Sequence, residues 1–100
     1  MVKHIILWQL KDALTDEQKG KIAADAKTHL EALKGKIDGL ADIRVITEKL
    51  PSATADMMLY STFSSADALK AYSVNEHHRA VADTYVRPFI ETRLCMDFEE

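Results

Sequence analysis

Three side chains able to transfer protons stand out in this sequence: His4, Tyr72 and His78. A neutral imidazole accepts or donates a proton near neutral pH, and a well-placed tyrosine hydroxyl can hold a carbonyl or enolate oxygen. The ordinary alternative is that each side chain only fills the core and satisfies its polar atoms locally. The remaining histidines are His29 and His77, and we expect both on the surface without a role.

The sequence lacks the motifs of metal, phosphate and nucleophile chemistry. The histidines and the single cysteine, Cys95, show no metal-ligand spacing. A glycine-rich phosphate loop and a G-x-S-x-G nucleophile turn are both absent. Cys95 has no second cysteine to pair with, and its apolar surroundings predict a buried, unreactive thiol. We therefore expect no metal and no cofactor.

Composition indicates one globular domain over residues 1–100, with 47% hydrophobic and 29% charged residues. The formal net charge is -3 and both signs alternate along the chain, so we expect no nucleic-acid surface. The longest apolar run, residues 4–8, is too short to span a membrane. Polar residues follow it at once, which does not fit a signal peptide. These features predict a cytoplasmic protein that does not interact with membranes.

Four segments rich in β-branched and aromatic residues are predicted to be strands: 2–10, 41–50, 56–63 and 89–98. A capping box at residues 15–18 starts a long helix, and Gly35 and Gly39 supply its stop signals. A short helix is predicted after Ser65, and Asn75 caps a last helix that ends before Pro88.

The predicted order of strand, helix, strand, strand, helices, strand is that of two βαβ halves. Such halves fold as an α+β, ferredoxin-like split βαβ domain, in which a four-stranded antiparallel sheet carries the helices on one face. The first and third strands are central in this topology, and both are apolar on both faces. Ile5 and Leu7, with Met58 and Tyr60, then lie on the face without helices. We expect a homodimer in which a second copy covers that face, giving a dimeric α+β barrel.

Strand alternation places His4 on the same face as Ile6 and Trp8, which we assign to the helix side. His78 follows the apolar stripe of the last helix, which must face the same side of the sheet. We therefore expect His4, Tyr72 and His78 in one cleft between sheet and helices. The apolar residues predicted to bind a ligand there are Ile6, Trp8, Ile22, Leu59, Val81, Phe89 and Leu94.

Three segments of the chain resemble the stress-responsive dimeric α/β-barrel (Dabb) family: VKHIILW at residues 2–8, LKGKIDGL at 33–40 and AYSVNEHH at 71–78. The resemblance implies the dimeric barrel fold over the whole chain. One plant branch of the family consists of polyketide cyclases that close a ring by aldol chemistry without a cofactor. His4, Tyr72 and His78 match the positions that line the cleft in that branch. The chain departs from it at Met57, where the branch has another histidine.

Three functional hypotheses follow. The first is a dimer that binds a small apolar or carbonyl-bearing molecule and has no known turnover. The second is a cofactor-free enzyme of polyketide-cyclase, aldol or proton-transfer type that uses His4, Tyr72 and His78. The third is a structural, stress-protective dimer with a filled core and no ligand.

Overall fold

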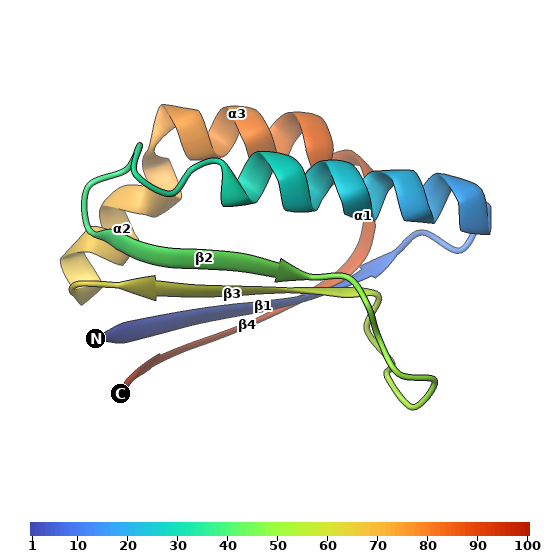
Figure 1. The fold of residues 1–100 in the computed structure, drawn as a ribbon, viewed down its shortest axis with the longest axis horizontal. Helices are drawn as coiled ribbons and strands as arrows, with labels where there is room; N and C mark the ends of the chain where they lie inside the picture. Colours follow the sequence, from blue (N-terminus) through green and yellow to red (C-terminus); the bar gives the residue numbers. More distant parts are fainter.

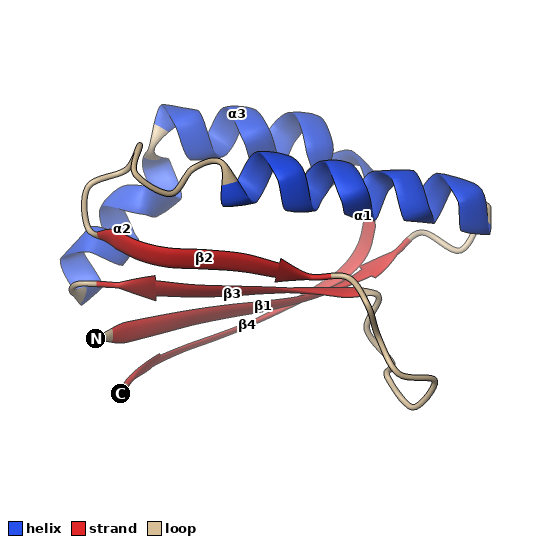
Figure 2. Ribbon diagram, in the orientation of Figure 1, coloured by secondary structure: helices blue, strands red, loops and turns tan.

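The computed structural model describes residues 1–100, which form one antiparallel sheet with the helices on one of its faces (Figures 1 and 2). The elements in chain order are β1 (Val2–Leu10), α1 (Asp16–Glu31), β2 (Leu40–Ile46), β3 (Met57–Phe63), α2 (Ala66–Val74), α3 (Glu76–Tyr85), the 3₁₀ turn η1 (Arg87–Phe89) and β4 (Ile90–Glu99). The strand order is β2-β3-β1-β4, so β1 and β3 are central. The predicted α+β ferredoxin-like fold with a four-stranded sheet is confirmed.

The second strand is shorter than predicted. β2 ends at Ile46, which pairs with Met58, and its partner β3 begins at Met57. Residues beyond 46 therefore have almost no strand left to pair with. Asp56 closes this end of the sheet, because its carboxylate accepts hydrogen bonds from the Leu10 amide at 2.7 Å and from Lys49 at 2.6 Å.

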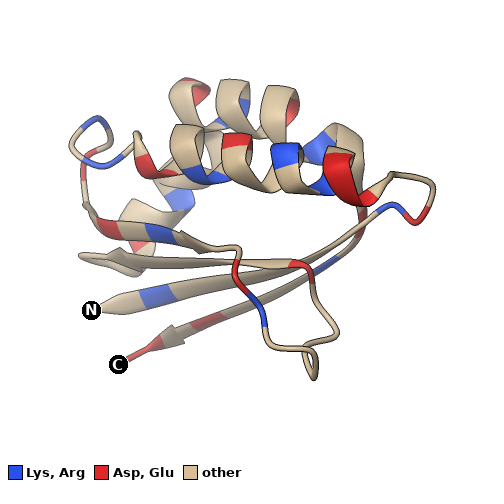
Figure 3. Ribbon diagram, turned by 45° about the vertical axis from the view of Figure 1, so that its right-hand side comes forward, with Lys and Arg blue, Asp and Glu red and all other residues tan.

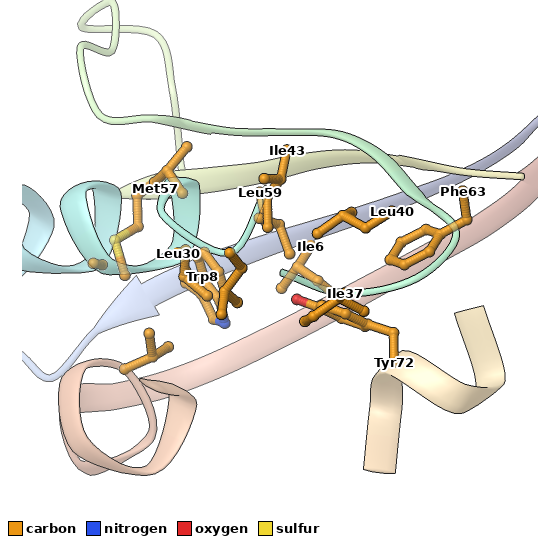
Figure 4. Packing of buried hydrophobic residues seen from close by; sticks show 14 of the residues in the cluster. Ile6, Trp8, Leu30, Ile37, Leu40, Ile43, Met57, Leu59, Phe63 and Tyr72 are labelled. Atoms are coloured by element: carbon orange, nitrogen blue, oxygen red, sulfur yellow. The ribbon is translucent and has the colours of Figure 1, made fainter. Parts of the chain in front are cut away.

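The core lies between the sheet and the helices. Every second residue of β1 is buried on this side: Val2, His4, Ile6, Trp8 and Leu10. α1 contributes Ile22, Ala26 and Leu30 at four-residue spacing, so they form one stripe that packs on the sheet. Figure 4 shows Leu30 beside Trp8 within this cluster. Burying one such large side chain contributes about 1.5–3 kcal/mol to folding.

The opposite face of the sheet carries apolar side chains that no helix covers. Its exposed members include Leu7 and Ile46 at 38%, Phe98 at 39%, and Leu94 and Met96 at 64% each. Ile5, Met58 and Tyr60 lie among them and are half-buried. We call this surface the open sheet face. It is the surface that the sequence predicts for contact with a second copy.

Charged residues do not gather on one side of the molecule in the view of Figure 3, where acidic and basic positions alternate along α1. Two ion pairs at four-residue spacing link them there, Lys21 with Asp25 at 3.0 Å and Lys27 with Glu31 at 2.9 Å. Pairs exposed to solvent in this way contribute little stability. None of the helices has the length and hydropathy that crossing a membrane requires.

Gly39 lets β2 start close to α2. Its φ angle of 82° lies in the left-handed region, and its carbonyl accepts a hydrogen bond from the Ser64 amide at 2.9 Å. A Cβ at this position would lie 2.5 Å from the Cβ of Ala68. A side chain at position 39 must therefore both strain the backbone and push α2 away.

We expect Gly39→Ala to lower the free energy of unfolding by about 2 kcal/mol, because the positive φ and the steric clash add. Gly20→Ala is the matched control. It lies within α1 with no atom within 4 Å of an added Cβ, and it should raise stability by about 0.5–1 kcal/mol. Urea unfolding followed by circular dichroism measures both changes, and a Gly39→Ala protein as stable as the parent would contradict the argument.

Candidate functional site

A cavity of about 410 Å³ opens between the sheet and the helices. Its floor is apolar and includes Ile6 and Trp8 from β1 and Leu59 from β3. The polar side chains on its walls come from five different elements, so only the folded chain brings them together. His4, Tyr72 and His78 all line this cavity, on β1, α2 and α3 respectively.

His4 is held by a carboxylate from the neighbouring strand. The β1–β4 register sets His4 opposite Asp97, and the imidazole Nδ1 lies 2.5 Å from the Asp97 Oδ1. The rings of Phe63 and Tyr72 meet the imidazole edge-on, with centroids at 6.2 and 6.1 Å. In a neutral imidazole that donates from Nδ1 to a carboxylate, Nε2 carries the lone pair and can accept a proton. Asp97 thus fixes the orientation of the imidazole.

Tyr72 is buried with its hydroxyl unpaired. The side chain is 1% exposed, and Figure 4 shows its ring reaching into the buried cluster. Its ring packs against Phe63 at 4.9 Å and stacks on His78 at 4.0 Å between centroids. Its hydroxyl has no hydrogen-bond partner. Burial raises the pKa of Tyr72 well above its usual value, so the group stays a neutral donor.

His78 is positioned by the start of α3. The side chain of Asn75 caps this helix by accepting from the amides of His77 at 2.9 Å and His78 at 3.4 Å. The Nδ1 of His78 is buried without a partner. Burial is the main cause that lowers the pKa of His78 to about 4, and the nearby guanidinium of Arg87 contributes to the same shift. The imidazole is therefore neutral at neutral pH, and it stacks on Tyr72 as a second unsatisfied polar group.

Three charged residues of this site were missed by the sequence interpretation: Arg87, Arg93 and Asp97. Both arginines line the cavity. Arg87 forms an ion pair with Asp83, whereas Arg93 forms none. The signal that could have found Arg93 and Asp97 is period-2 alternation along β4, since they lie opposite Trp8 and His4.

The predicted apolar wall is only partly correct. Ile6, Trp8 and Leu59 line the cavity, but Ile22 and Phe89 line a separate depression of about 350 Å³ beside Tyr85. Val81 lies in a third hollow, on the side of α3 that faces α1. The apolar stripe of a helix packs against several neighbouring elements along its length. A residue on that stripe therefore does not have to line this cavity.

The expectations for two residues of β4 are wrong. Leu94 pairs with Leu7 and belongs to the open sheet face, on the far side from the cavity. Cys95 is exposed, because β4 is an edge strand that extends beyond the cover of the helices. Burial, together with the adjacent Asp97 carboxylate, still raises the pKa of the Cys95 thiol.

Comparisons with known proteins give one family and several solved structures. The sequence profile of the stress responsive A/B barrel domain (Dabb) matches residues 2–100. A comparison with curated proteins gives no match. A dimeric protein of unknown function and ferredoxin-like fold from Bacteroides fragilis is 33% identical, with a TM-score of 0.92 over 99% of this chain and 95% of that chain.

Two further structures share the fold at lower identity. A Dabb family protein from Mesorhizobium loti is 20% identical, with a TM-score of 0.74 over 99% of this chain and 95% of its own. A hydroxynitrile lyase from Passiflora edulis is 19% identical, with a TM-score of 0.70 over 97% of this chain and 90% of its own.

The lowered pKa of His78 predicts a specific pH dependence of stability. The His78 imidazole takes up its proton near pH 6.5 in the unfolded chain but only near pH 4 in the folded chain. The free energy of unfolding should therefore fall as the pH drops through this window, by roughly 1–2 kcal/mol for a partly shielded group. Comparing wild type with His78→Gln by urea unfolding isolates this contribution from that of the carboxylates.

His77→Gln, one residue earlier and exposed, is the matched control and should follow the wild type. If wild type and His78→Gln lose stability in parallel on acidification, burial of a neutral His78 is contradicted.

Proposed function

The chain belongs to the stress responsive A/B barrel (Dabb) family, and we propose that it is a homodimer whose cavity binds a small, largely apolar molecule with a carbonyl or carboxylate group. The observation that carries the proposal is the pair of buried polar atoms without partners, the Tyr72 hydroxyl and the His78 Nδ1, beside a cavity of about 410 Å³.

Unpaired polar atoms favour a ligand energetically. A buried hydroxyl or imidazole nitrogen without a partner costs about 1–3 kcal/mol in the folded protein. A ligand oxygen that accepts from Tyr72 would recover part of that cost on binding. The apolar floor around Trp8 and Leu59 suits an aliphatic or aromatic body.

The charges on the cavity wall favour an acidic group on that ligand. Arg93 is a cavity-lining guanidinium without an ion pair, whereas Arg87 already pairs with Asp83. Guanidinium binds carboxylates through two parallel hydrogen bonds, which fixes orientation as well as charge. We therefore expect carboxylates to bind better than the corresponding neutral amides.

A second copy of the chain is the partner that best fits the open sheet face. That face gathers Ile5, Leu7, Met58 and Tyr60 with the apolar residues of β4. The similar Bacteroides fragilis structure is described as dimeric, which supports the same assembly here. A stable sheet-on-sheet contact would bury about 1,500 Å² or more in total.

Cofactor-free proton transfer is a second candidate function, favoured by the His4–Asp97 pair. His4 would accept a proton at Nε2 from a carbon next to a carbonyl, while Asp97 holds Nδ1. The Tyr72 hydroxyl would donate a hydrogen bond to the enolate oxygen that forms. The two groups that would act on the substrate, His4 and Tyr72, both line the cavity, and neither step uses a cofactor.

The dimer is tested with a charge on the open sheet face. Leu94 is 64% exposed in the single chain, so Leu94→Glu should leave the monomer folded. In a dimer the carboxylate would be buried without a partner, and the mass by light scattering should fall from two chains to one. Val74→Glu, at the end of α2 on the helix side of the sheet and 69% exposed, is the matched control and should stay dimeric. A wild-type protein that is already monomeric would overturn this part of the proposal.

Phenylpyruvate, an aromatic 2-keto acid, is a suitable probe of the cavity because it combines an apolar ring, a carbonyl and a carboxylate. NMR titration should show saturable binding, and Arg93→Gln and Tyr72→Phe should each weaken it by about tenfold. Arg79→Gln, an exposed arginine on α3, is the matched control. Equal weakening by Arg79→Gln, or no binding by the wild type, would contradict the cavity proposal and favour a structural dimer.

The same samples in D₂O separate binding from proton transfer. If the second candidate function is correct, the wild type accelerates exchange of the benzylic protons of phenylpyruvate, and His4→Gln and Tyr72→Phe reduce that rate by about tenfold or more. Saturable binding without accelerated exchange leaves only the binding function.

A further inference from the structure

Three side chains of different chemistry meet where β1 pairs with the edge strand β4, and one of them, His4, also lines the cavity. The Nδ1 of His4, the Sγ of Cys95 and an oxygen of Asp97 all lie within 4.8 Å of one another. We propose that these three side chains form a binding site for a divalent transition-metal ion, with Zn²⁺ as the ion that fits best. This inference goes beyond the proposed ligand binding, although the two sites share His4. With the metal bound at Nδ1 the imidazole proton lies on Nε2, so His4 acts as a base only in the metal-free protein.

The antiparallel register brings the three side chains together. Asp97 is directly opposite His4, and Cys95 is two residues earlier on β4 and opposite Ile6. Residues two apart on a strand point to the same face, so both β4 side chains project beside the imidazole. Because β1 is central and fully paired, the backbone on both sides of the site is fixed.

The spacing of the donor atoms is close to that of a tetrahedral site. Cys95 Sγ lies 3.4 Å from Asp97 Oδ1 and 3.9 Å from His4 Nδ1. Metal bonds of about 2.0–2.3 Å at tetrahedral angles set such atoms roughly 3.3–3.7 Å apart. Only the 2.5 Å contact between His4 and Asp97 is too short, and it must open by a little under 1 Å. Asp97 is 45% exposed and can make that movement by rotating its side chain.

The donor set selects the class of ion. A thiolate and an imidazole are borderline-soft ligands that favour Zn²⁺ and its neighbours, whereas Mg²⁺ and Ca²⁺ prefer oxygen donors. Three protein ligands leave a fourth tetrahedral position for water, which the exposure of Cys95 and Asp97 allows. The rings of Phe63 and Tyr72 hold the imidazole plane from the other side.

The charges also balance. Asp97 forms no ion pair with a lysine or arginine, and its one contact with a group that can become positively charged is with His4. On binding, the thiol of Cys95 releases its proton to solvent, and the single proton of the neutral imidazole moves from Nδ1 to Nε2. Thiolate and carboxylate then neutralise the two positive charges of the ion.

Cobalt(II) titration of the metal-free, untagged protein tests the site, because Co²⁺ replaces Zn²⁺ in tetrahedral sites and reports its ligands by colour. We expect one Co²⁺ per chain, with the visible bands of tetrahedral Co²⁺ and a thiolate charge-transfer band, both removed by added Zn²⁺. Cys95→Ser should abolish the charge-transfer band, and Asp97→Asn should weaken binding by about tenfold or more. Glu99→Gln, an exposed acid two residues beyond Asp97, is the matched control and should bind as the wild type does.

Absence of the charge-transfer band in the folded wild type would overturn the proposal. So would unchanged Co²⁺ affinity in both Cys95→Ser and Asp97→Asn, since binding would then come from other surface histidines. Circular dichroism of each variant checks that the fold is intact. Phenylpyruvate binding is read out separately, so a failed metal site and a failed ligand cavity give different results.

Discussion

The two central strands are apolar on both faces, while the helices cover only one of those faces. In β1, the side chains of His4, Ile6 and Trp8 face the helices, whereas those of Ile5 and Leu7 face the other side of the sheet. The hydrophobic effect acts on both faces alike, so each face requires its own cover. The helices that supply one cover also enclose the cavity, because α2 and α3 together do not fill the space above β1 and β4. Cavity and open sheet face thus follow from the same patterning of the same two strands.

Inside the cavity, burial determines protonation more than any ion pair does. It keeps Tyr72 protonated and His78 neutral, so both enter any reaction as hydrogen-bonding groups without charge. Positive charge comes instead from Arg93 at the cavity wall. In the proposed ligand complex, Arg93 would bind the acidic group while the uncharged Tyr72 would bind the carbonyl, so the two groups would be recognised separately. This arrangement lowers the stability of the folded protein, because two buried polar atoms are left without hydrogen-bond partners.

Sequence patterns predicted the strands, the caps and the convergence of elements around the cavity, because each depends on local spacing. Alternation along β1 identified the buried face, since that strand is covered on one side along its whole length. The same reasoning failed on β4, where the strand lies at the edge and both of its faces are exposed. Apolar content there suggested that Leu94 pointed inward and hid the roles of Arg93 and Asp97. Their positions follow from the register with β1, which depends on tertiary pairing that no local pattern encodes.

The pairing of β1 with β4 joins residues that are 93 positions apart, as with His4 and Asp97. During synthesis β1 leaves the ribosome first and β4 last. The pairing of β1 with β4 can therefore form only after every other element has been synthesised. Until then the apolar residues of β1 have β3 on one side and an unpaired edge on the other. Such an edge is a template for association between unfinished chains and a natural binding site for chaperones. The site at His4 is therefore a late product of folding, and a nascent chain that lacks β4 has neither the oriented imidazole nor a closed sheet.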